Sequence, residues 1–220
     1  MGLLNRLAPR RSDAEAGVAT APLAGDDPVF ATKALRKFLT SLTSRESPVL
    51  LDLGPVVGGN VNFFGEQLGC KIFVEDIYAD LDRHVREGKL EALAEFFKKR
   101  FPQADSSFDG VLCWDVMDYL DRASAQELAA QMMRVLRPDG ALLAFFATAS
   151  PREPRENRYT KYIIVDEVNL KHRSYAAARG RGTSLLNRDI IRMFSGLRVS
   201  DSFLLQNNLR EILFRKPVAS

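Results

Sequence analysis

The sequence has little of what disulfide-stapled or metal-binding proteins need. It holds two cysteines and two histidines among 220 residues, too few for a disulfide framework or a histidine-rich metal site. Cys70 and Cys113 stand in apolar runs, as buried free thiols of a reducing compartment do. We therefore expect a fold held by its apolar core, without a metal site, in a cytoplasmic protein.

Long apolar runs are also missing. No stretch approaches the ~18 consecutive apolar residues of a membrane span, and the first residues lack the apolar core of a secretory signal. The pair Arg10-Arg11 is followed at once by acids, which disfavours a twin-arginine signal. Residues 1–27, rich in Ala, Gly, Pro and charge, are predicted to be a mobile N-terminal leader.

An excess of one charge is absent too. The 31 basic and 28 acidic residues leave a net charge of +3, so the chain as a whole is no nucleic-acid-binding polycation. Its 46% hydrophobic and 27% charged residues are ordinary for a globular protein. Residues 28–217 are thus expected to fold as a single domain with a sizeable core.

What the sequence does contain is an alternation of helical and strand patterns. Helices are predicted over 30–39, 60–68, 79–100, 123–136 and 188–195, and strands over 49–53, 71–76, 108–114, 141–146, 197–205 and 209–215. Strands alternating with helices, followed by a hairpin, predict an α/β fold: a doubly wound, mostly parallel sheet with a C-terminal antiparallel hairpin. Ligands of such sheets bind outside the carboxyl ends of the strands.

The loop after the first buried strand carries the most information. Residues 50–54 read Leu-Leu-Asp-Leu-Gly, Gly58 follows, and the next strand ends in Glu75-Asp76. Glycine lets a backbone approach a ligand closely and permits positive φ. An acid beside such a loop can pair with a ligand's ammonium group, and an acid ending the second strand can accept hydrogen bonds from ribose hydroxyls.

This arrangement resembles the class I S-adenosylmethionine-dependent methyltransferases, whose first loop reads acid-x-Gly-x-Gly-x-Gly. The resemblance implies that Asp52 is the first-loop acid and that Gly54 and Gly58 are the first and third glycines. Val56 stands in place of the middle glycine, and Pro55 stiffens the loop. The implied cofactor is S-adenosyl-L-methionine, with S-adenosyl-L-homocysteine as the product.

The resemblance also implies a ribose-binding acid, which is either Asp76 or Glu75. Asp76 is favoured because the Asp-Ile step at 76–77 matches the family's usual step from Asp to a hydrophobic residue. Residues 108–120 look like the family's fourth strand and its exit loop, where the cofactor's methyl group is presented, so Asp115 is a further cofactor-binding candidate. Residues 134–140 resemble the turn before the fifth strand.

One expected element is missing from this pattern. Residues 77–107 contain no clear strand, only helical spacing, so the third strand at the sheet's edge is predicted to be reduced or absent. In the family that strand normally precedes an acid that contacts the adenine. The sequence assigns no residue to that role.

The catalytic candidates are Asp115, Tyr119 and His172. Methyl transfer by in-line displacement depends mainly on proximity and orientation, so a dedicated base is optional in this family. Where the acceptor needs deprotonation, a carboxylate in a water-poor pocket can have a raised pKa and act as the base. Structural roles are expected for three other residues: Asp109 supports a strand start, Trp114 belongs to the core, and His84 is solvated.

Residues 147–183 are predicted to be a basic cap insertion above the strand ends, where loops carry specificity. Residues 151–182 contain eight Lys or Arg against four Asp or Glu, with Tyr159, Tyr162 and Tyr175 interleaved. Such a patch can hold an anionic substrate or RNA phosphates, while the plainer interpretation is a solvated surface loop. The predicted partner is a methyl acceptor, for which a small anionic molecule is one candidate and RNA a less favoured one.

The favoured function is an S-adenosylmethionine-dependent methyltransferase acting on an oxygen or nitrogen atom of an unidentified acceptor. The alternative is a catalytically inactive S-adenosylmethionine-binding or scaffold protein on the same fold, motivated by Val56 and the missing strand. A nicotinamide-dependent oxidoreductase ranks last because the loop has no G-x-G-x-x-G. The sequence does not predict the acceptor or the oligomeric state.

Overall fold

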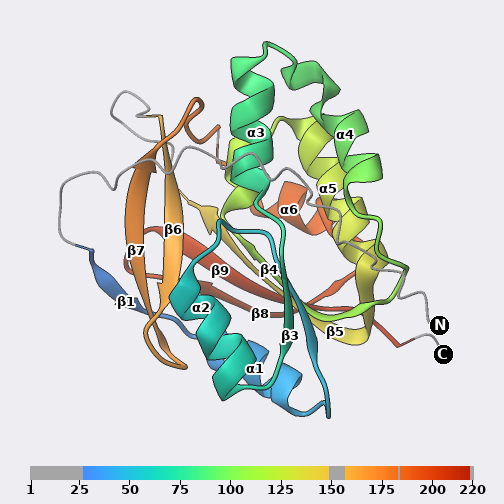
Figure 1. The fold of residues 1–220 in the computed structure, drawn as a ribbon, viewed down its shortest axis with the longest axis vertical. Coiled ribbons are helices and arrows are strands. Elements are labelled where there is room, and N and C mark those ends of the chain that lie inside the picture. Colours follow the sequence, from blue (N-terminus) through green and yellow to red (C-terminus); the bar gives the residue numbers. More distant parts are fainter. Residues whose placement is uncertain (1–26, 149–156, 183, 219–220) are drawn as a thin grey trace, which may run out of the picture.

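A computed structural model describes residues 27–148, 157–182 and 184–218. A central six-stranded sheet has the order β3-β2-β4-β5-β9-β8, and a second sheet of three strands has the order β1-β7-β6 (Figure 1). The strands are β1 (Val29–Ala31), β2 (Val49–Asp52), β3 (Lys71–Val74), β4 (Phe108–Trp114), β5 (Leu136–Ala147), β6 (Arg158–Ile164), β7 (Asn169–Ala176), β8 (Arg198–Leu204) and β9 (Leu209–Arg215). The α-helices are α1 (Leu35–Thr43), α2 (Gly58–Asn62), α3 (Ile77–Arg86), α4 (Leu93–Arg100), α5 (Arg122–Val135) and α6 (Asn187–Met193), with a π-helical turn Phe63–Gln67 and 3₁₀ turns Leu90–Ala92 and Val116–Tyr119.

The pairing of the central strands confirms the predicted fold class. Strands β3, β2, β4 and β5 are parallel neighbours, and β9 runs antiparallel between β5 and β8. The carboxyl ends of the four parallel strands therefore meet at one edge of the sheet, where ligands of doubly wound folds bind.

Two apolar cores cover the two faces of this sheet. Successive side chains of a strand point to opposite faces, so Leu51 packs in the core that α3, α4 and α5 share, whereas Leu50 packs against Phe38 of α1. Figure 1 shows α3, α4 and α5 grouped together, apart from α1 and α2. The site at the strand ends is thus framed from both faces.

The missing third strand is confirmed in the described chain. Residues 77–100 form α3, a 3₁₀ turn and α4, and β3 is left as the edge of the sheet. Two expectations were wrong in detail. The first helix begins at Leu35, because Phe30 joins the short strand β1, and His84 is buried because its Nδ1 bonds the Asp80 carbonyl at 2.7 Å and its ring packs on Phe96.

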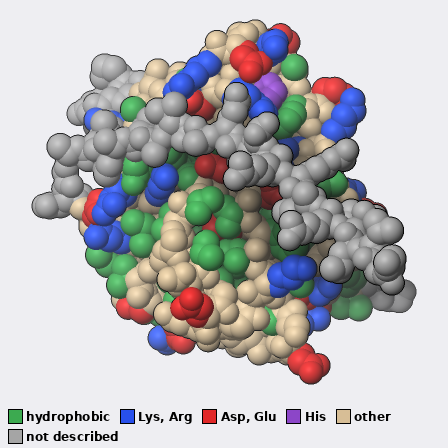
Figure 2. Space-filling model, in the orientation of Figure 1, with side chains coloured by type: hydrophobic (Ala, Val, Ile, Leu, Met, Phe, Trp, Pro, Cys, Tyr) green, Lys and Arg blue, Asp and Glu red, His purple; other side chains and the backbone are tan. Residues whose placement is uncertain are grey.

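Strands β6 and β7 of the predicted cap insertion form a small antiparallel sheet with β1 from near the start of the described chain, which we call the cap sheet. Its buried residues Tyr162, Ile164 and Leu170 belong to the same apolar core as α1 and the face of the central sheet that carries Leu50. Figure 2 shows lysine and arginine side chains along the edge of the molecule that β6 and β7 form. The cap sheet is therefore packed on the domain rather than solvated as a loop.

Two further expectations are only partly open to the structure. Of the predicted leader, residues 1–27, all but Asp27 lie outside the described residues. Asp27 itself forms an ion pair with Arg173 of β7. No helix in the described stretches is long and apolar enough to cross a membrane.

Candidate active site

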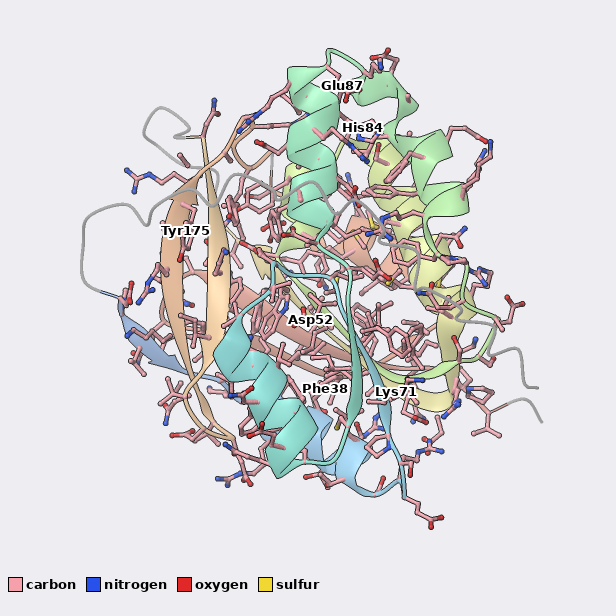
Figure 3. The ribbon with its side chains drawn as sticks, viewed as in Figure 1. Phe38, Asp52, Lys71, His84, Glu87 and Tyr175 are labelled. Atoms are coloured by element: carbon pink, nitrogen blue, oxygen red, sulfur yellow. The ribbon has the colours of Figure 1, made fainter. Side chains whose placement is uncertain are left out.

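Asp52 is the central acid of the site. It ends β2 and lies in the middle of the molecule, beside α2 and β6 (Figure 3). Its Oδ1 accepts hydrogen bonds from the Gly54 backbone N–H at 2.9 Å and from the Trp114 indole Nε1 at 2.6 Å. Burial raises the pKa of the Asp52 carboxyl to about 6, although these two donors act to lower it.

Trp114 belongs to the apolar core, as expected, and is also a direct neighbour of Asp52. Its φ of 49° is in the left-handed region, which a bulky residue rarely adopts. The register of β4 against β5 also shifts between Leu112 and Trp114, as at a β-bulge. The two features together aim the indole across Gly54, where a Cβ atom would lie 2.7 Å from Trp114 Cδ1.

Asp115 follows Trp114 and is fully buried at the end of β4. Its Oδ1 accepts a hydrogen bond from the Tyr78 hydroxyl, and its Oδ2 accepts one from the Tyr119 hydroxyl at 3.4 Å. Its Oδ2 also forms an ion pair with the Arg181 guanidinium. We call Asp115, Tyr78 and Tyr119 the acid–tyrosine pocket.

The charges of this pocket are strongly coupled. Burial and the Asp115 carboxylate both raise the pKa of Tyr78 and Tyr119 well above the usual value, so both phenols stay protonated. Burial alone would lower the pKa of Arg181, but the Asp115 carboxylate holds it above its ordinary value. The pocket therefore contains two phenol donors beside the ion pair of Arg181 with Asp115.

All five tyrosines of the chain lie around this pocket, and the single tryptophan lies beside it. Tyr78 contacts Tyr119 edge-on with ring centres 5.1 Å apart and stacks on Tyr159 at 5.2 Å. Tyr175 continues the row from the cap sheet, 5.5 Å from Tyr159 (Figure 3). Tyr162 stacks on Trp114 at 5.3 Å and is almost parallel to it, with an interplanar angle of 8°.

The two candidate ribose acids are in different environments. Glu75 is held by Arg100, with 2.6 Å between its Oε2 and the guanidinium Nη1. Asp76 caps α3 by accepting the Ala79 N–H at 3.0 Å, and burial raises the pKa of its carboxyl. Among the described residues Asp76 forms no ion pair, so it is the acid with free acceptor capacity.

The glycine loop is open on its outer side. Gly58 and Gly59 are exposed, and a Cβ atom at either would have no neighbour within 4 Å. The next residue, Asn60, is buried and joins α2 to the cap sheet. Its Nδ2 donates to the Tyr162 carbonyl and its Oδ1 accepts the Ile164 N–H, both at 2.8 Å.

Where the structure describes the chain, His172 forms no direct bond with the other catalytic candidates, although the charges of Arg181 and Asp115 act on its ring. It is on β7, opposite Tyr162 in the register of the cap sheet, and its ring packs on Phe30. Burial lowers the pKa of its imidazole, so the ring is neutral at pH 7. Within the described chain no hydrogen bond joins it to Asp115 or Tyr119, so the structure brings together two of the three candidates.

A carboxyl that sequence reasoning did not select lies next to the pocket. Asp118 is buried, and its Oδ2 accepts the Ala147 N–H at 2.7 Å, while its Oδ1 has no partner among the described residues. Burial, with the Asp115 charge second, raises the pKa of Asp118 to about 7. Asp109, in contrast, has the expected structural role, because its Oδ2 accepts the Val49 N–H and pairs with Arg137.

Sequence reasoning missed Trp114, Tyr78 and Arg181 as members of the site. Tyr78 follows the strand-end acids by two residues, a signal that was present in the sequence. Arg181 was counted only as one charge of the basic cap, because its distance of 66 residues from Asp115 hides the ion pair. The described residues contain no group of three or more His, Cys, Asp or Glu placed to hold a metal ion.

Comparison with known families agrees with this geometry. Residues 50–140 match a family model described as a methyltransferase domain. This stretch is similar to a methyltransferase domain. The match includes Asp52, Gly54, Asp76 and Asp115, so the resemblance to class I methyltransferases is confirmed. It ends before the cap sheet, and Arg181 therefore comes from outside the matched stretch.

Methyl transfer is the general chemistry of this domain family. A curated relative, the phosphoethanolamine N-methyltransferase of Plasmodium falciparum, is 23% identical over 137 residues, covering 60% of this chain and 51% of the relative. This chain thus spans about half the length of that relative.

Similar solved structures include two methyltransferases. The Burkholderia thailandensis 1,6-didemethyltoxoflavin-N1-methyltransferase, solved with bound 1,6-didemethyltoxoflavin and S-adenosylhomocysteine, has a TM-score of 0.49 and 16% identity, and the match covers 84% of this chain and 79% of that one. A glycopeptide N-methyltransferase complexed with S-adenosyl-L-methionine has a TM-score of 0.44 and 18% identity over 83% of this chain and 92% of that one.

Proposed function

We propose that this protein is an S-adenosylmethionine-dependent methyltransferase that modifies an oxygen or nitrogen atom of its acceptor. The observation that carries the proposal is the placement of Asp52, Asp76 and Asp115 at the carboxyl ends of three neighbouring parallel strands within the matched domain. When bound, the cofactor would supply an electrophilic methyl group. The chain's own residues would supply orientation and exclude water, as proximity-driven transfer requires.

The described residues fit this cofactor at its nucleoside end. Asp76 has free acceptor capacity for ribose hydroxyls, and the exposed backbone of Gly58 and Gly59 leaves room beside it. They do not fit it at the sulfonium end in the arrangement described. There Trp114 covers Gly54, and Arg181 already neutralises Asp115.

Proton removal from the acceptor is best assigned to a carboxyl. The raised pKa values make Tyr78 and Tyr119 poor bases at neutral pH. Asp115 is engaged by Arg181, whereas Asp118 has a pKa of about 7 and an unbonded Oδ1, which suits a general base. His172 remains a candidate only for an acceptor that reaches β7.

The acceptor is proposed to be a small molecule carrying negative charge. Part of the cap's positive charge is balanced within the protein, because Arg173 and Lys171 share Asp27 and Arg181 pairs with Asp115. Arg179 has no ion pair with the described carboxylates and lines a surface cavity of about 200 Å³ together with Arg181. At this cavity one guanidinium suits a single anionic group better than an RNA backbone, which needs several phosphate contacts.

Thermal unfolding with added ligand tests the cofactor. A ligand at a hundredfold excess over its dissociation constant adds about 2.7 kcal/mol to the native state, which for a domain of this size raises the midpoint by roughly 5–10 °C. We expect such a rise with S-adenosylmethionine, none with NADH, and a smaller rise in Asp76→Asn. Absence of any rise in the folded wild type, at millimolar ligand, would count against cofactor use.

The inactive scaffold is kept as a second candidate because one observation favours it. The ion pair of Arg181 with Asp115 leaves the sulfonium end closed by the protein's own side chains. A scaffold that has lost the cofactor would show no ligand-dependent rise in any variant, including those in which Arg181 is replaced. The same melting experiment therefore separates a scaffold without cofactor from a cofactor-binding protein. Formation of S-adenosylhomocysteine in the presence of an acceptor separates an active enzyme from an inactive S-adenosylmethionine-binding protein.

A further inference from the structure

Arg181 is the cation of the acid–tyrosine pocket. Its Nη2 pairs with Asp115 Oδ2, its Nε donates to the Tyr119 hydroxyl at 3.2 Å, and its guanidinium lies 5.7 Å from the centre of the Tyr119 ring. Among the described residues no other lysine, arginine or histidine forms an ion pair with Asp115. The fully buried carboxylate therefore depends on one side chain for its counter-charge.

A carboxylate flanked by aromatic rings is a binding site for cations in general. Ring faces and edges attract a positive charge held close to them, more strongly in a desolvated site, and a nearby carboxylate adds Coulomb attraction. The sulfonium of S-adenosylmethionine is such a cation, whereas the thioether of S-adenosylhomocysteine is neutral. The guanidinium of Arg181 and a sulfonium would thus compete for the same charge.

We propose that Arg181 is a built-in competitor of the cofactor. Its guanidinium occupies the cation site formed by Asp115, Tyr78 and Tyr119. When segment 177–182 moves away and takes Arg181 with it, the sulfonium end of the cofactor enters this site. This inference rests on the proposed function and adds regulation of the same site by the cap. It explains why the cofactor's polar partners are present while the space beside Asp115 is filled.

The segment that carries Arg181 is held by few bonds. Four backbone N–H groups tie it down. Ala177 donates to the Asn157 carbonyl at 2.8 Å, Ala178 to the Asp82 side chain at 2.7 Å, Gly180 to the Asn157 side chain at 3.0 Å and Gly182 to the Asp118 carbonyl at 2.6 Å. Arg181 itself is not sealed in, since 31% of its side chain is exposed. Withdrawal therefore requires movement of one short segment, while β6 and β7 stay paired.

The charge of the ligand gives this inference its own signature. When a sulfonium replaces the guanidinium, Asp115 keeps a counter-charge, whereas a neutral thioether would leave the buried carboxylate unpaired. Removal of the Arg181 charge should therefore strengthen binding of S-adenosylmethionine much more than binding of S-adenosylhomocysteine. A residue that only stabilises the fold would not separate the two ligands.

The fluorescence of Trp114 reports on the site directly, because it is the single tryptophan of the chain and bonds Asp52. We would titrate S-adenosylmethionine and S-adenosylhomocysteine into wild type, Arg181→Gln and the matched control Arg179→Gln, which removes a charge from the same segment without touching Asp115. Arg181→Gln is expected to bind S-adenosylmethionine at least ten times more tightly than wild type, with a smaller gain for S-adenosylhomocysteine. Arg179→Gln is expected to bind both as wild type does.

Arg181→Gln leaves Asp115 without its partner, so folding must be checked by circular dichroism. If that variant fails to fold, the neutral pair Asp115→Asn with Arg181→Gln replaces it, and the expected result is equal affinity for the two ligands. If folded Arg181→Gln binds S-adenosylmethionine no more tightly than wild type, and wild type binds measurably, Arg181 does not compete with the cofactor. If wild type and every folded variant bind neither ligand, the proposed function itself is wrong.

Discussion

At the scale of single residues, Gly54 shows how closely the site is packed. An added Cβ atom would lie 2.7 Å from Cδ1 and 2.8 Å from Nε1 of Trp114. Gly54→Ala should therefore lower the free energy of unfolding by about 1–3 kcal/mol, as overpacking does, and the loss should show in urea denaturation. The cost should shrink in a Trp114→Ala background, because neighbouring substitutions are coupled.

Gly59→Ala is the matched control for this prediction. Gly59 lies in α2 with open space around it, so alanine there should leave stability unchanged or raise it by up to about 1 kcal/mol. Equal losses at Gly54 and Gly59 would show that Trp114 does not constrain the loop.

Asp118 makes stability depend on pH. Its carboxyl has a pKa of about 7 in the folded protein, against about 3.9 in an unfolded chain. Between pH 4 and pH 7 the folded state thus binds a proton that the unfolded state has lost, so the free energy of unfolding falls as pH rises through this window. Asp118→Asn removes this titration and should stabilise the protein at pH 8 but not at pH 4.

The size of this effect is on the order of 4 kcal/mol, because the pKa differs by about 3 units and each unit corresponds to about 1.4 kcal/mol. Urea denaturation of wild type and Asp118→Asn at pH 4.5, 6 and 8 measures it. A difference between the two proteins that does not change with pH would contradict the raised pKa of Asp118. Asp52, whose carboxyl has a pKa of about 6, keeps a smaller fall with rising pH in both proteins.

At the scale of elements, Asn60 fastens α2 to the cap sheet. Its amide satisfies the Tyr162 carbonyl and the Ile164 N–H, which alanine would leave unpaired. Asn60→Ala should lower the free energy of unfolding by about 2 kcal/mol and should speed hydrogen exchange of the Ile164 amide. Asn62→Ala, an exposed change in the same helix, should do neither.

Elements of strong periodicity could be predicted from the sequence, and contacts across the chain could not. Strands β2 and β4 and the helix α5 are where apolar runs and turn residues placed them. The extent of β5 differed, because it begins at Leu136 and takes in the turn chemistry of 137–140 as an irregular stretch with Asp139 at a φ of 59°. Pairing register and bulges depend on the partner strand, which local sequence does not reveal.

The same division applies to the site. Asp52, Asp76 and Asp115 end parallel strands, so fold class alone places them together. Trp114 was assigned to the core because an apolar residue in a buried strand usually lies there, and only its left-handed backbone turns it onto Gly54. The ion pair of Arg181 with Asp115 could not be predicted from local sequence, because it forms only when the cap folds back over the strand ends.

At the scale of the whole molecule, the cap sheet shares one of the two apolar cores with the central sheet. Tyr162, Ile164 and Leu170 of the cap sheet pack in the cluster that contains Phe38 and Leu50. We therefore expect a single unfolding transition, in which far-ultraviolet circular dichroism and Trp114 fluorescence give the same midpoint and the calorimetric and van't Hoff enthalpies agree. Separate midpoints would show that the cap sheet unfolds as an independent unit.

The place of β9 has a consequence for how the protein is made. This last strand of the described chain lies between β5 and β8, so the hydrogen-bonding edge of β5 is completed by residues that the ribosome adds after all the other described strands. Until then residues 141–146, an unbroken apolar stretch, present an open strand edge of the kind that promotes aggregation. A nascent chain interrupted before Leu209 would be expected to depend on chaperones to remain in solution.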